Sequence, residues 1–432
     1  MIGRNRRNTQ ADNTSNSTLA EPVTIDDGRA VLYGGNWHFE YSLNRGATWF
    51  NVPIPSGPAD APDGCCDPDI VYDRARGLTI WSYLYMNSGG TNGAVRFYVR
   101  RNVWDTHACS YTIDPAAGAN NLVPDYPHLG LSNDFLYLTV NNVGAGTNSA
   151  QVYRLSLNDI GECGAVSGSV YTYNWSYGQR VFVPVEGAKE IMYWGAMVDS
   201  NDFRVYSWPE NSGTISEYTR AVNVSNFTNP DCRGGVGNYD FIERDTAWDI
   251  RGFRMRGAVG PNGLLFLWNV GSDGSHPQGH VHSALFRESD LAVIGQPHIW
   301  SSGYCVGYPA LSVNDRGDYG LSIAAGGQSG GGGSAAQGYV SIDDDFTSGA
   351  GRFDAIYRTA SGTHNRSDSR FGDYFSVRRD VPCGNWFAAT NYSLNNGSSS
   401  TNVNARYVNF GRGRDYGCYI GWTFRSRQPL PP

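Results

Sequence analysis

Acidic, basic and aromatic side chains stand at the starts of several predicted strands, where together they could bind or cleave a carbohydrate. Carboxyl groups act as acids and bases or bind hydroxyl groups, arginines pair with sugar carboxylates, and aromatic rings stack on sugar faces. The predicted catalytic residues are Asp67, Asp69, Asp125, His128, Asp373 and Tyr374. The predicted substrate-binding residues are Tyr126, Trp194, Arg254, Arg256, Tyr308 and Arg370. The alternative is a structural role, because Asp at a strand start also caps turns.

Residues 276–282 form the most metal-like segment, with three histidines in seven residues. Residues two apart on a strand point to the same face, as ligands of one ion must, so His280 and His282 are the predicted metal ligands. The ion would be a divalent metal such as Zn²⁺ or Mn²⁺. Asp343-Asp344-Asp345 could instead hold Ca²⁺, although the spacing of an EF-hand loop is absent. The alternative is a Gly- and Pro-rich hairpin loop that binds no metal.

The eight cysteines indicate disulfides and an oxidising compartment, so we expect a secreted protein, extracellular or periplasmic. No CxxC spacing occurs, which leaves zinc ribbons and thioredoxin-type centres without support. Cys383 and Cys418 are the predicted structural pair, because a bridge there would lock the end of the fold. The adjacent Cys65 and Cys66 form either a vicinal disulfide or two separate bridges. Sequons, which fit a glycoprotein and surface loops, occur at Asn13, Asn16, Asn174, Asn223, Asn226, Asn365, Asn391 and Asn396.

The charge balance argues against a nucleic-acid partner. The 432 residues include 33 Lys and Arg against 40 Asp and Glu, a net charge of −7, whereas phosphate binding needs a basic face. No apolar run approaches the roughly 18 residues of a membrane span, so no membrane span is expected. The sequence also lacks a GxSxG elbow, a Walker A loop, a Rossmann fingerprint and an HExxH motif. The serine-esterase, nucleotide-binding and zincin classes are therefore excluded.

An internal repeat supplies the elements that must position these residues. Six segments share an alternating apolar strand, a polar turn and a second, more aromatic strand, and they begin at Cys66, Asp125, Tyr193, Arg254, Gly307 and Gly372. Equivalent positions lie about 61 residues apart on average, which fits four short strands with their loops, or one propeller blade. The innermost strand of each blade lines a central channel. The strand starts should therefore converge on one funnel.

The stretch ahead of the first repeat predicts a seventh blade, because it holds strands in AVLYGG, WHFEYS and WFNV. The C-terminal GCYIGWTF would supply its missing strand and close the ring; six blades remain possible if these strands only complete the last unit. Residues 1–22 are polar and free of aromatics, and we expect a disordered arm. Residues 23–432 are expected to form a single all-β domain, a β-propeller.

The turn from Ser42 to Trp49 reads SLNRGATW and resembles the Asp-box, S-x-D-x-G-x-T-W, of the sialidase-like propellers, with Asn44 in the Asp position. A short polar side chain caps such a turn and Gly46 allows positive φ. The remaining segments resemble secreted bacterial propeller proteins of unassigned activity. A sialidase would add three arginines, a Tyr/Glu nucleophilic pair, an Asp acid and an F/Y-R-I-P motif, and the sequence lacks that motif.

We therefore expect a propeller that binds a glycan in its central funnel, either as a glycoside hydrolase or as a uronate-directed polysaccharide lyase. Two inner-strand carboxyl groups about 5 to 10 Å apart would favour hydrolysis. A histidine beside a funnel tyrosine and arginine would favour lyase chemistry. The alternative is a non-catalytic lectin, adhesin or structural component of a surface or filament, because one fold hosts many functions.

Overall fold

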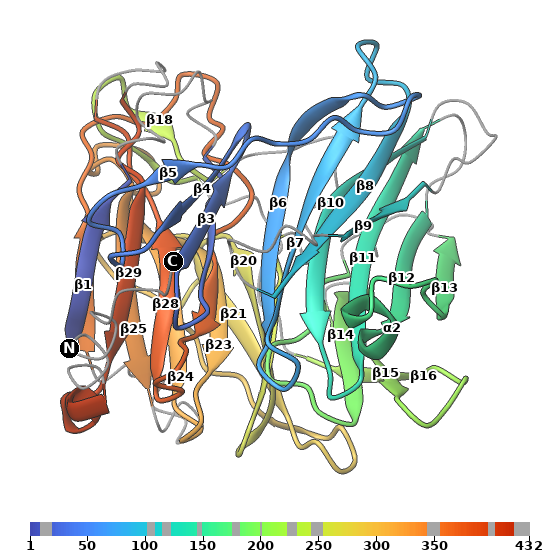
Figure 1. Ribbon diagram of the computed structural model, residues 1–432. Coiled ribbons are helices and arrows are strands. Elements are labelled where there is room, and N and C mark those ends of the chain that lie inside the picture. Colours follow the sequence, from blue (N-terminus) through green and yellow to red (C-terminus); the bar gives the residue numbers. More distant parts are fainter. Residues whose placement is uncertain are drawn as a thin grey trace.

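The computed structural model describes residues 1–8, 20–101, 109–114, 122–144, 149–174, 182–198, 201–222, 231–242, 254–343, 355–395 and 402–418. In these residues seven sheets of three or four antiparallel strands form the blades of a β-propeller ring (Figure 1). The predicted all-β propeller is confirmed, and the described strands make seven blades rather than six. No helix in the described ranges is long and apolar enough to cross a membrane.

The strands are given blade by blade, and in every blade but blade 4 the order runs from the innermost strand outward. Blades 1 and 2 consist of β2 (Val23–Asp26), β3 (Val31–Gly35), β4 (His38–Ser42) and β5 (Phe50–Asn51), then β6 (Asp63–Asp73), β7 (Leu78–Met86), β8 (Gly93–Arg100) and β9 (Cys109–Ile113). Blade 3 consists of β10 (Leu122–Leu131), β11 (Phe135–Gly144), β12 (Ser149–Ser156) and β13 (Gly168–Asn174), with the short helix α2 (Leu157–Gly161) after β12. Blade 4 contributes β14 (Ile191–Met197), β15 (Asp202–Pro209) and β16 (Ser216–Ala221).

The second half of the ring follows the same order. Blade 5 consists of β19 (Arg256–Gly260), β20 (Gly263–Val270), β21 (His280–Phe286) and β22 (Val293–Gly295). Blade 6 consists of β23 (Cys305–Val313), β24 (Tyr319–Gly326), β25 (Gln337–Asp343) and β26 (Ala355–Ala360). Blade 7 consists of β27 (Val377–Arg379), β28 (Trp386–Asn391), β29 (Arg406–Gly411) and β1 (Ile2–Arg7). A separate two-stranded sheet pairs β17 (Arg233–Gly234) with β18 (Tyr239–Asp240), and a 3₁₀ turn covers Gly413–Asp415.

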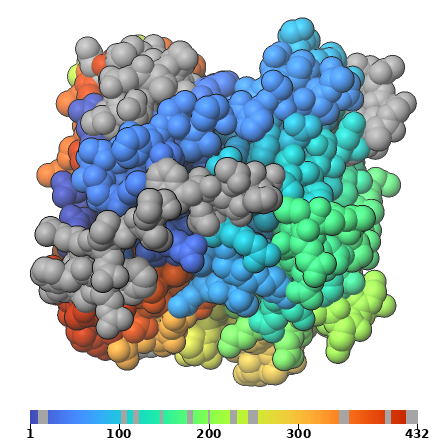
Figure 2. All heavy atoms as spheres, in the orientation of Figure 1, coloured from blue at the N-terminus to red at the C-terminus, as the bar shows by residue number. Residues whose placement is uncertain are grey.

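The first strand of the chain closes the ring. Strand β1 pairs antiparallel with β29, with Ile2 opposite Phe410 and Arg7 opposite Arg406. In Figure 2 dark blue atoms of the first strands lie against red and orange atoms of the last ones. The arm expected over residues 1–22 is therefore wrong for β1, whose backbone groups are paired in the sheet. The segment GCYIGWTF, which was expected to supply a strand to blade 1, lies outside the described residues from position 419 onward. Blade 1 has four strands of its own.

Aromatic side chains pack between the blades and account for much of the core. Trp81 stacks between Phe39 and Tyr98, with ring centroids 4.2 and 4.1 Å away, and is 1% exposed. Trp194, Trp268 and Trp386, in three other blades, are also fully buried. Each buried aromatic removes a large apolar area from water, and edge or offset ring contacts add to that gain. Many of the aromatic residues in the described part of the chain are thus buried in the core.

The turn between β4 and β5 has a closed network of hydrogen bonds. The Asn44 side chain accepts from the Thr48 backbone N–H at 2.8 Å and donates to the Thr48 hydroxyl. The Gly46 N–H donates to the Ser42 hydroxyl at 2.7 Å, with the glycine at a φ of 79°. Trp49 is buried and packs edge-on against Tyr33 of blade 1 and Tyr407 of blade 7. This turn therefore ties the first blade to the last.

All eight cysteines are paired in disulfides. The bond between Cys383 and Cys418 confirms that prediction, and Cys65 and Cys66 form the vicinal disulfide rather than two separate bridges. The other two bonds are Cys109–Cys163 and Cys232–Cys305.

Two sequons lie inside the fold and not in surface loops. Asn365 is 2% exposed and its amide donates to the carbonyls of Gly234 and Tyr239. Asn391 is fully buried in β28. Neither side chain can accept a glycan in the folded chain. Asn174 is exposed at the end of β13, whereas the sequons at Asn13, Asn16, Asn223, Asn226 and Asn396 lie outside the described residues.

Candidate functional site

A repeated backbone feature brings side chains from five blades to one end of the channel, which we call the channel mouth. In the described ranges five inner strands carry a residue with left-handed φ, either just before the strand, as at Glu21 (42°) and Arg254 (62°), or within it, as at Asp67 (52°), Tyr126 (55°) and Tyr308 (54°). A proline follows four of these residues. The strand register shifts at the same place in β6, β10 and β23, as in a β-bulge. Such a bulge bends the strand and redirects a side chain, here toward the other blades.

Four carboxyl groups from blades 1, 2, 3 and 7 meet at the channel mouth. Asn36 links two of them, because its amide donates to Glu21 Oε2 at 2.7 Å and accepts from the Asp67 backbone N–H at 3.0 Å. The Asp67 carboxyl group interacts with those of Glu21 and Asp125 and shifts both of their pKa values. The Asp373 backbone N–H donates to Glu21 Oε1 at 3.1 Å. We call Glu21, Asp67, Asp125 and Asp373 the carboxyl cluster.

The carboxyl cluster retains protons near neutral pH. Burial and the nearby charge of Asp373 raise the pKa of Glu21 to about 8. Burial and the neighbouring Asp67 raise the pKa of Asp125 to about 7. The pKa of Asp67 lies well above its ordinary value for the same reasons, and burial also raises the pKa of Asp373 against the opposing charge of Arg254. Like charges this close cannot all ionise, so the cluster shares protons among its members.

Arginines and tyrosines surround the carboxyl cluster. Arg254 Nη2 donates to Asp373 Oδ1 at 3.3 Å, and its guanidinium lies 4.7 Å from the ring centroid of Tyr308. Arg256 Nη1 donates to the Tyr126 hydroxyl at 3.2 Å. Arg370 is exposed, and its charge lowers the pKa values of Glu21, Asp125 and Asp373. Most of the predicted site residues therefore do come together at the channel mouth.

The channel is filled below its mouth by a second charged group. Asp69 accepts hydrogen bonds from Arg378, from the Leu129 backbone N–H at 2.8 Å and from His128 Nδ1 at 3.4 Å. Burial alone would raise the pKa of Asp69, but Arg378 and His128 outweigh it and hold that pKa at about 2. Burial and the charge of Arg256 lower the pKa of His128 to about 4, so this imidazole is neutral.

Tyr374 completes this group. Its ring centroid lies 5.1 Å from that of His128 and 5.7 Å from that of Tyr126, both edge-on. The Arg256 guanidinium lies 5.3 Å from the Tyr374 centroid, while the Tyr374 hydroxyl donates to the Pro68 carbonyl at 2.9 Å. The Nε2 atom of His128 is buried without a hydrogen-bond partner. A histidine, two tyrosines and an arginine are thus in contact within the channel.

Trp194 does not belong to the channel mouth. It lies in β14, is fully buried, and stacks on Tyr206 with the ring planes 6° apart. The repeat pattern predicts β14 as the innermost strand of blade 4, but that place is held by residues 182–187. Glu186 bonds through its backbone to Gly257 and Val259 of β19, and Val185 bonds to Tyr193 of β14. Strand β14 is therefore the second strand of its blade, and its aromatic side chains pack between blades.

Three residues of the channel are not predicted from the sequence pattern, namely Glu21, Glu186 and Arg378. Arg378 Nη1 donates to Glu186 Oε1 at 2.7 Å and Arg378 Nη2 donates to Asp69, so one buried cation joins two carboxylates. Glu21 had a usable signal, because Glu21-Pro22 repeats the pattern of Asp67-Pro68.

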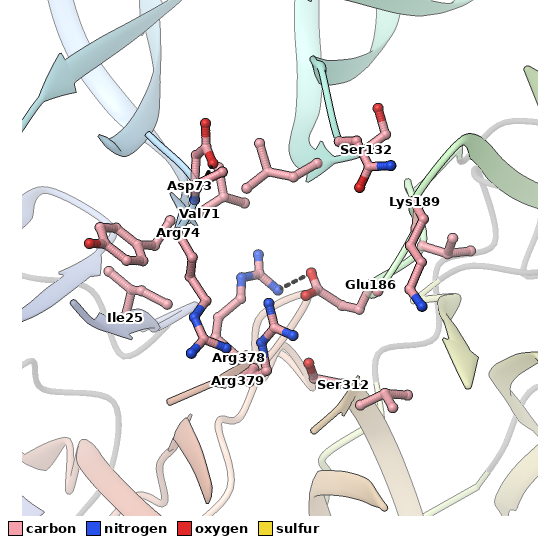
Figure 3. A pocket seen from close by; sticks show the side chains of 18 of the residues that line it. Ile25, Val71, Asp73, Arg74, Ser132, Glu186, Lys189, Ser312, Arg378 and Arg379 are labelled. Atoms are coloured by element: carbon pink, nitrogen blue, oxygen red, sulfur yellow. Dashed lines mark hydrogen bonds and ion pairs between the residues drawn. The ribbon is translucent and has the colours of Figure 1, made fainter. Parts of the chain in front are cut away.

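A cavity of about 750 Å³ opens at the opposite end of the inner strands. Figure 3 shows Arg378 at its centre, bonded to Glu186, with Arg379 and Arg74 on one side and Lys189 on the other. Arg74 and Arg379 both pair with Asp315, which lies outside the cavity lining. Its arginines thus already have carboxylate partners, and its volume is typical of a ligand pocket.

Four histidines lie together at the outer part of blade 5. The nitrogens of His276, His280 and His298 that could bind a metal lie within 4.8 Å of one another. His282, predicted to pair with His280, instead accepts a hydrogen bond at Nε2 from the Gln296 amide at 3.1 Å. The possible Ca²⁺ segment is described only at Asp343, which is buried, while Asp344 and Asp345 lie outside the described residues.

No family model matches the chain, and no curated protein is similar to it in sequence. Among solved structures it is similar to the Trypanosoma rangeli sialidase in complex with the inhibitor DANA, with a TM-score of 0.42 and 9% identity over 100% of this chain and 65% of that one. The K499G mutant of NanB sialidase from Streptococcus pneumoniae gives a TM-score of 0.38 and 12% identity, covering 95% of this chain and 70% of that one. A protein of unknown function from Dyadobacter fermentans gives 0.43 and 12%, covering 79% and 98%.

Proposed function

We propose that the protein binds a glycan at the channel mouth and hydrolyses it, with the carboxyl cluster supplying the catalytic acid and base. The observation that carries this proposal is the set of carboxyl groups that share protons near neutral pH. A glycoside hydrolase needs one protonated carboxyl group to protonate the leaving oxygen and one ionised group to activate water or attack the sugar. Groups whose environments push their pKa values apart are suited to these two roles.

Exposure assigns the roles within the cluster. Asp125 is partly exposed and its pKa is about 7, so it is the acid that can reach a glycosidic oxygen. The Asp373 carboxyl group is 18% exposed and pairs with Arg254, whose charge opposes the rise in pKa that burial causes, so Asp373 is the proposed base or nucleophile. Glu21 and Asp67 are buried beneath them and tune their protonation. Arg370, exposed beside the cluster, suits the carboxylate of an acidic sugar.

The test is a panel of acidic and neutral polysaccharides, with reducing ends measured as the product. We expect new reducing ends with at least one acidic substrate, and a loss of about 10²-fold or more for Asp125→Asn. Asp134→Asn, which changes an exposed aspartate at the opposite end of the inner strands, is the matched control. Binding without any product would refute hydrolysis and leave the non-catalytic lectin or adhesin. Unchanged activity of Asp125→Asn would refute the assignment of the acid.

A uronate-directed lyase is the second candidate, because His128, Tyr374 and Arg256 are in contact below the mouth. A lyase removes a proton next to the sugar carboxylate and leaves an unsaturated product that absorbs ultraviolet light. The same panel separates the two reactions, since hydrolysis produces reducing ends without that absorbance. The four disulfides support a location in an oxidising compartment, extracellular or periplasmic.

A further inference from the structure

We infer that His276, His280 and His298 form a Zn²⁺ site in blade 5, separate from the channel mouth. His280 begins β21, His276 lies in the loop before it, and His298 lies in the segment after β22. Val281 and Ile299 exchange backbone hydrogen bonds at 3.1 and 2.9 Å, which brings the two segments together. All three possible ligand nitrogens lie within 4.8 Å of one another.

Hydrogen bonds to the outer ring nitrogens prepare two of the imidazoles for metal binding. His276 Nδ1 lies 3.0 Å from both carboxylate oxygens of Asp273, and His280 Nδ1 lies 3.2 Å from the Gln278 carbonyl. These oxygens can only accept, so in both rings Nδ1 carries the hydrogen and Nε2 offers its lone pair. Histidine ligands of zinc usually donate their other ring N–H to a carboxylate or a carbonyl in this way.

The spacing of the third ring agrees with a shared ion. His280 Nε2 lies 3.2 Å from His298 Nδ1. Two nitrogens at about 2.0 to 2.1 Å from one tetrahedral zinc ion lie roughly 3.3 Å apart, so this pair needs little movement to bind it. The rings of His276 and His298 are stacked with their centroids 4.5 Å apart. A small inward shift of His276 would complete a three-nitrogen set.

His282 is not a fourth ligand of this set. Its Nε2 accepts from the Gln296 amide at 3.1 Å, and its ring packs against Trp268 and edge-on against His298. His276 and His298 are partly exposed, and the half-exposed Trp300 stands edge-on to His276. Water can therefore reach the ion. Three histidines with an open fourth position are a donor set typical of zinc.

A bound ion would join the loop before β21 to the segment after β22. Both segments lie in the outer part of blade 5, where β22 is only three residues long and pairs with β21 at two positions. An ion that binds only the folded chain stabilises it in proportion to the logarithm of its concentration over Kd. The site thus strengthens a weakly paired blade edge, whatever happens at the channel mouth.

The test is a Zn²⁺ titration of the chelator-treated, oxidised full chain by calorimetry. Co²⁺ absorption in the visible range serves as a second measurement of the ligand geometry. We expect one high-affinity Zn²⁺ per chain and the intense bands of tetrahedral Co²⁺. His298→Ala should abolish this binding, and Asp273→Asn should weaken it by about 10-fold to 100-fold. His364→Ala, which removes an imidazole of another part of the ring, should bind as the unchanged protein does.

The outcomes decide between the alternatives. His282→Gln should bind Zn²⁺ as the unchanged protein does, since the His282 ring already bonds to Gln296. If His282→Gln lost as much Zn²⁺ affinity as His298→Ala while its near-ultraviolet circular dichroism stayed unchanged, the proposed ligand set would be overturned. Absence of stoichiometric binding to the unchanged protein would overturn the site itself. The measurement does not depend on a glycan, so it stands apart from the proposed hydrolysis.

Discussion

Replacing Glu21 with glutamine should make the stability of the protein less dependent on pH. Glu21 is completely buried in the carboxyl cluster, and burial with the charge of Asp373 raises its pKa from 4.5 to about 8. The folded chain therefore holds a proton that the unfolded chain releases at neutral pH. The stability that Glu21 contributes is fully present below its pKa in the unfolded chain. It is lost as the pH rises through its pKa in the folded chain. Glutamine resembles the protonated acid and has nothing to release.

The size of the effect follows from the two pKa values. Between them the free energy of unfolding falls by about 1.4 kcal/mol for each pH unit. Between about pH 5 and about pH 8 the unchanged protein should therefore lose about 3 kcal/mol of its free energy of unfolding through Glu21. Glu21→Gln should not show this loss. Contacts that glutamine breaks, such as the bond from Asn36, change stability by the same amount at both pH values. They cancel in the comparison.

Urea unfolding followed by tryptophan fluorescence, with the disulfides intact, measures these free energies. The control is Glu190→Gln, because Glu190 is exposed at the opposite end of the channel and takes no part in the carboxyl cluster. If the stability of Glu21→Gln relative to the unchanged protein were the same near pH 5 and near pH 8, the carboxyl cluster would not hold the extra proton. The acid proposed for hydrolysis would then lose its physical basis.

Two further predictions concern stability. Arg378→Ala removes the 12% exposed cation that bridges the buried Asp69 and the partly exposed Glu186, so Asp69 loses its charge partner. It should lower the free energy of unfolding by about 3 kcal/mol. Arg379→Ala, whose side chain is 41% exposed, should cost less than about 1 kcal/mol; equal losses for the two variants would contradict the buried bridge. Replacing both Cys109 and Cys163 with serine opens a loop of 54 residues and should cost about 4 kcal/mol in the same urea assay. An unchanged unfolding midpoint would show that this disulfide constrains the unfolded chain very little.

The blade repeat could be predicted because its signals are local. Hairpin turns, alternating strands and a spacing of about 61 residues are properties of each segment by itself. Strand β1 gave no such signal, since IGRNRR is polar and does not alternate. It becomes a strand only because it pairs with the edge of β29. That pairing places Ile2 opposite Phe410, which is far away in the sequence. The inner segment 182–187 is short and was overlooked beside the more aromatic β14.

The candidate site could be predicted in part for the same reason. Strand starts were recognised in blades 2, 3, 5, 6 and 7, and their side chains do meet. Glu21 was missed because residues 1–22 were expected to be disordered. His298 was missed because its distance of 16 residues from His282 says nothing until β21 and the segment after β22 pair. Residues brought together only by tertiary pairing leave no local pattern in the sequence.

The residue with left-handed φ in or just before five of the described inner strands separates the chemistry of the channel mouth from the sheets that carry it. The same backbone position carries an acid in Glu21 and Asp67, a phenol in Tyr126 and Tyr308, and a guanidinium in Arg254. A following proline and the register of the strand hold the main chain, so the side chain is free to differ from blade to blade. The side chains at these positions can therefore be changed one at a time, as in the loops of an antibody, while the sheets keep their structure.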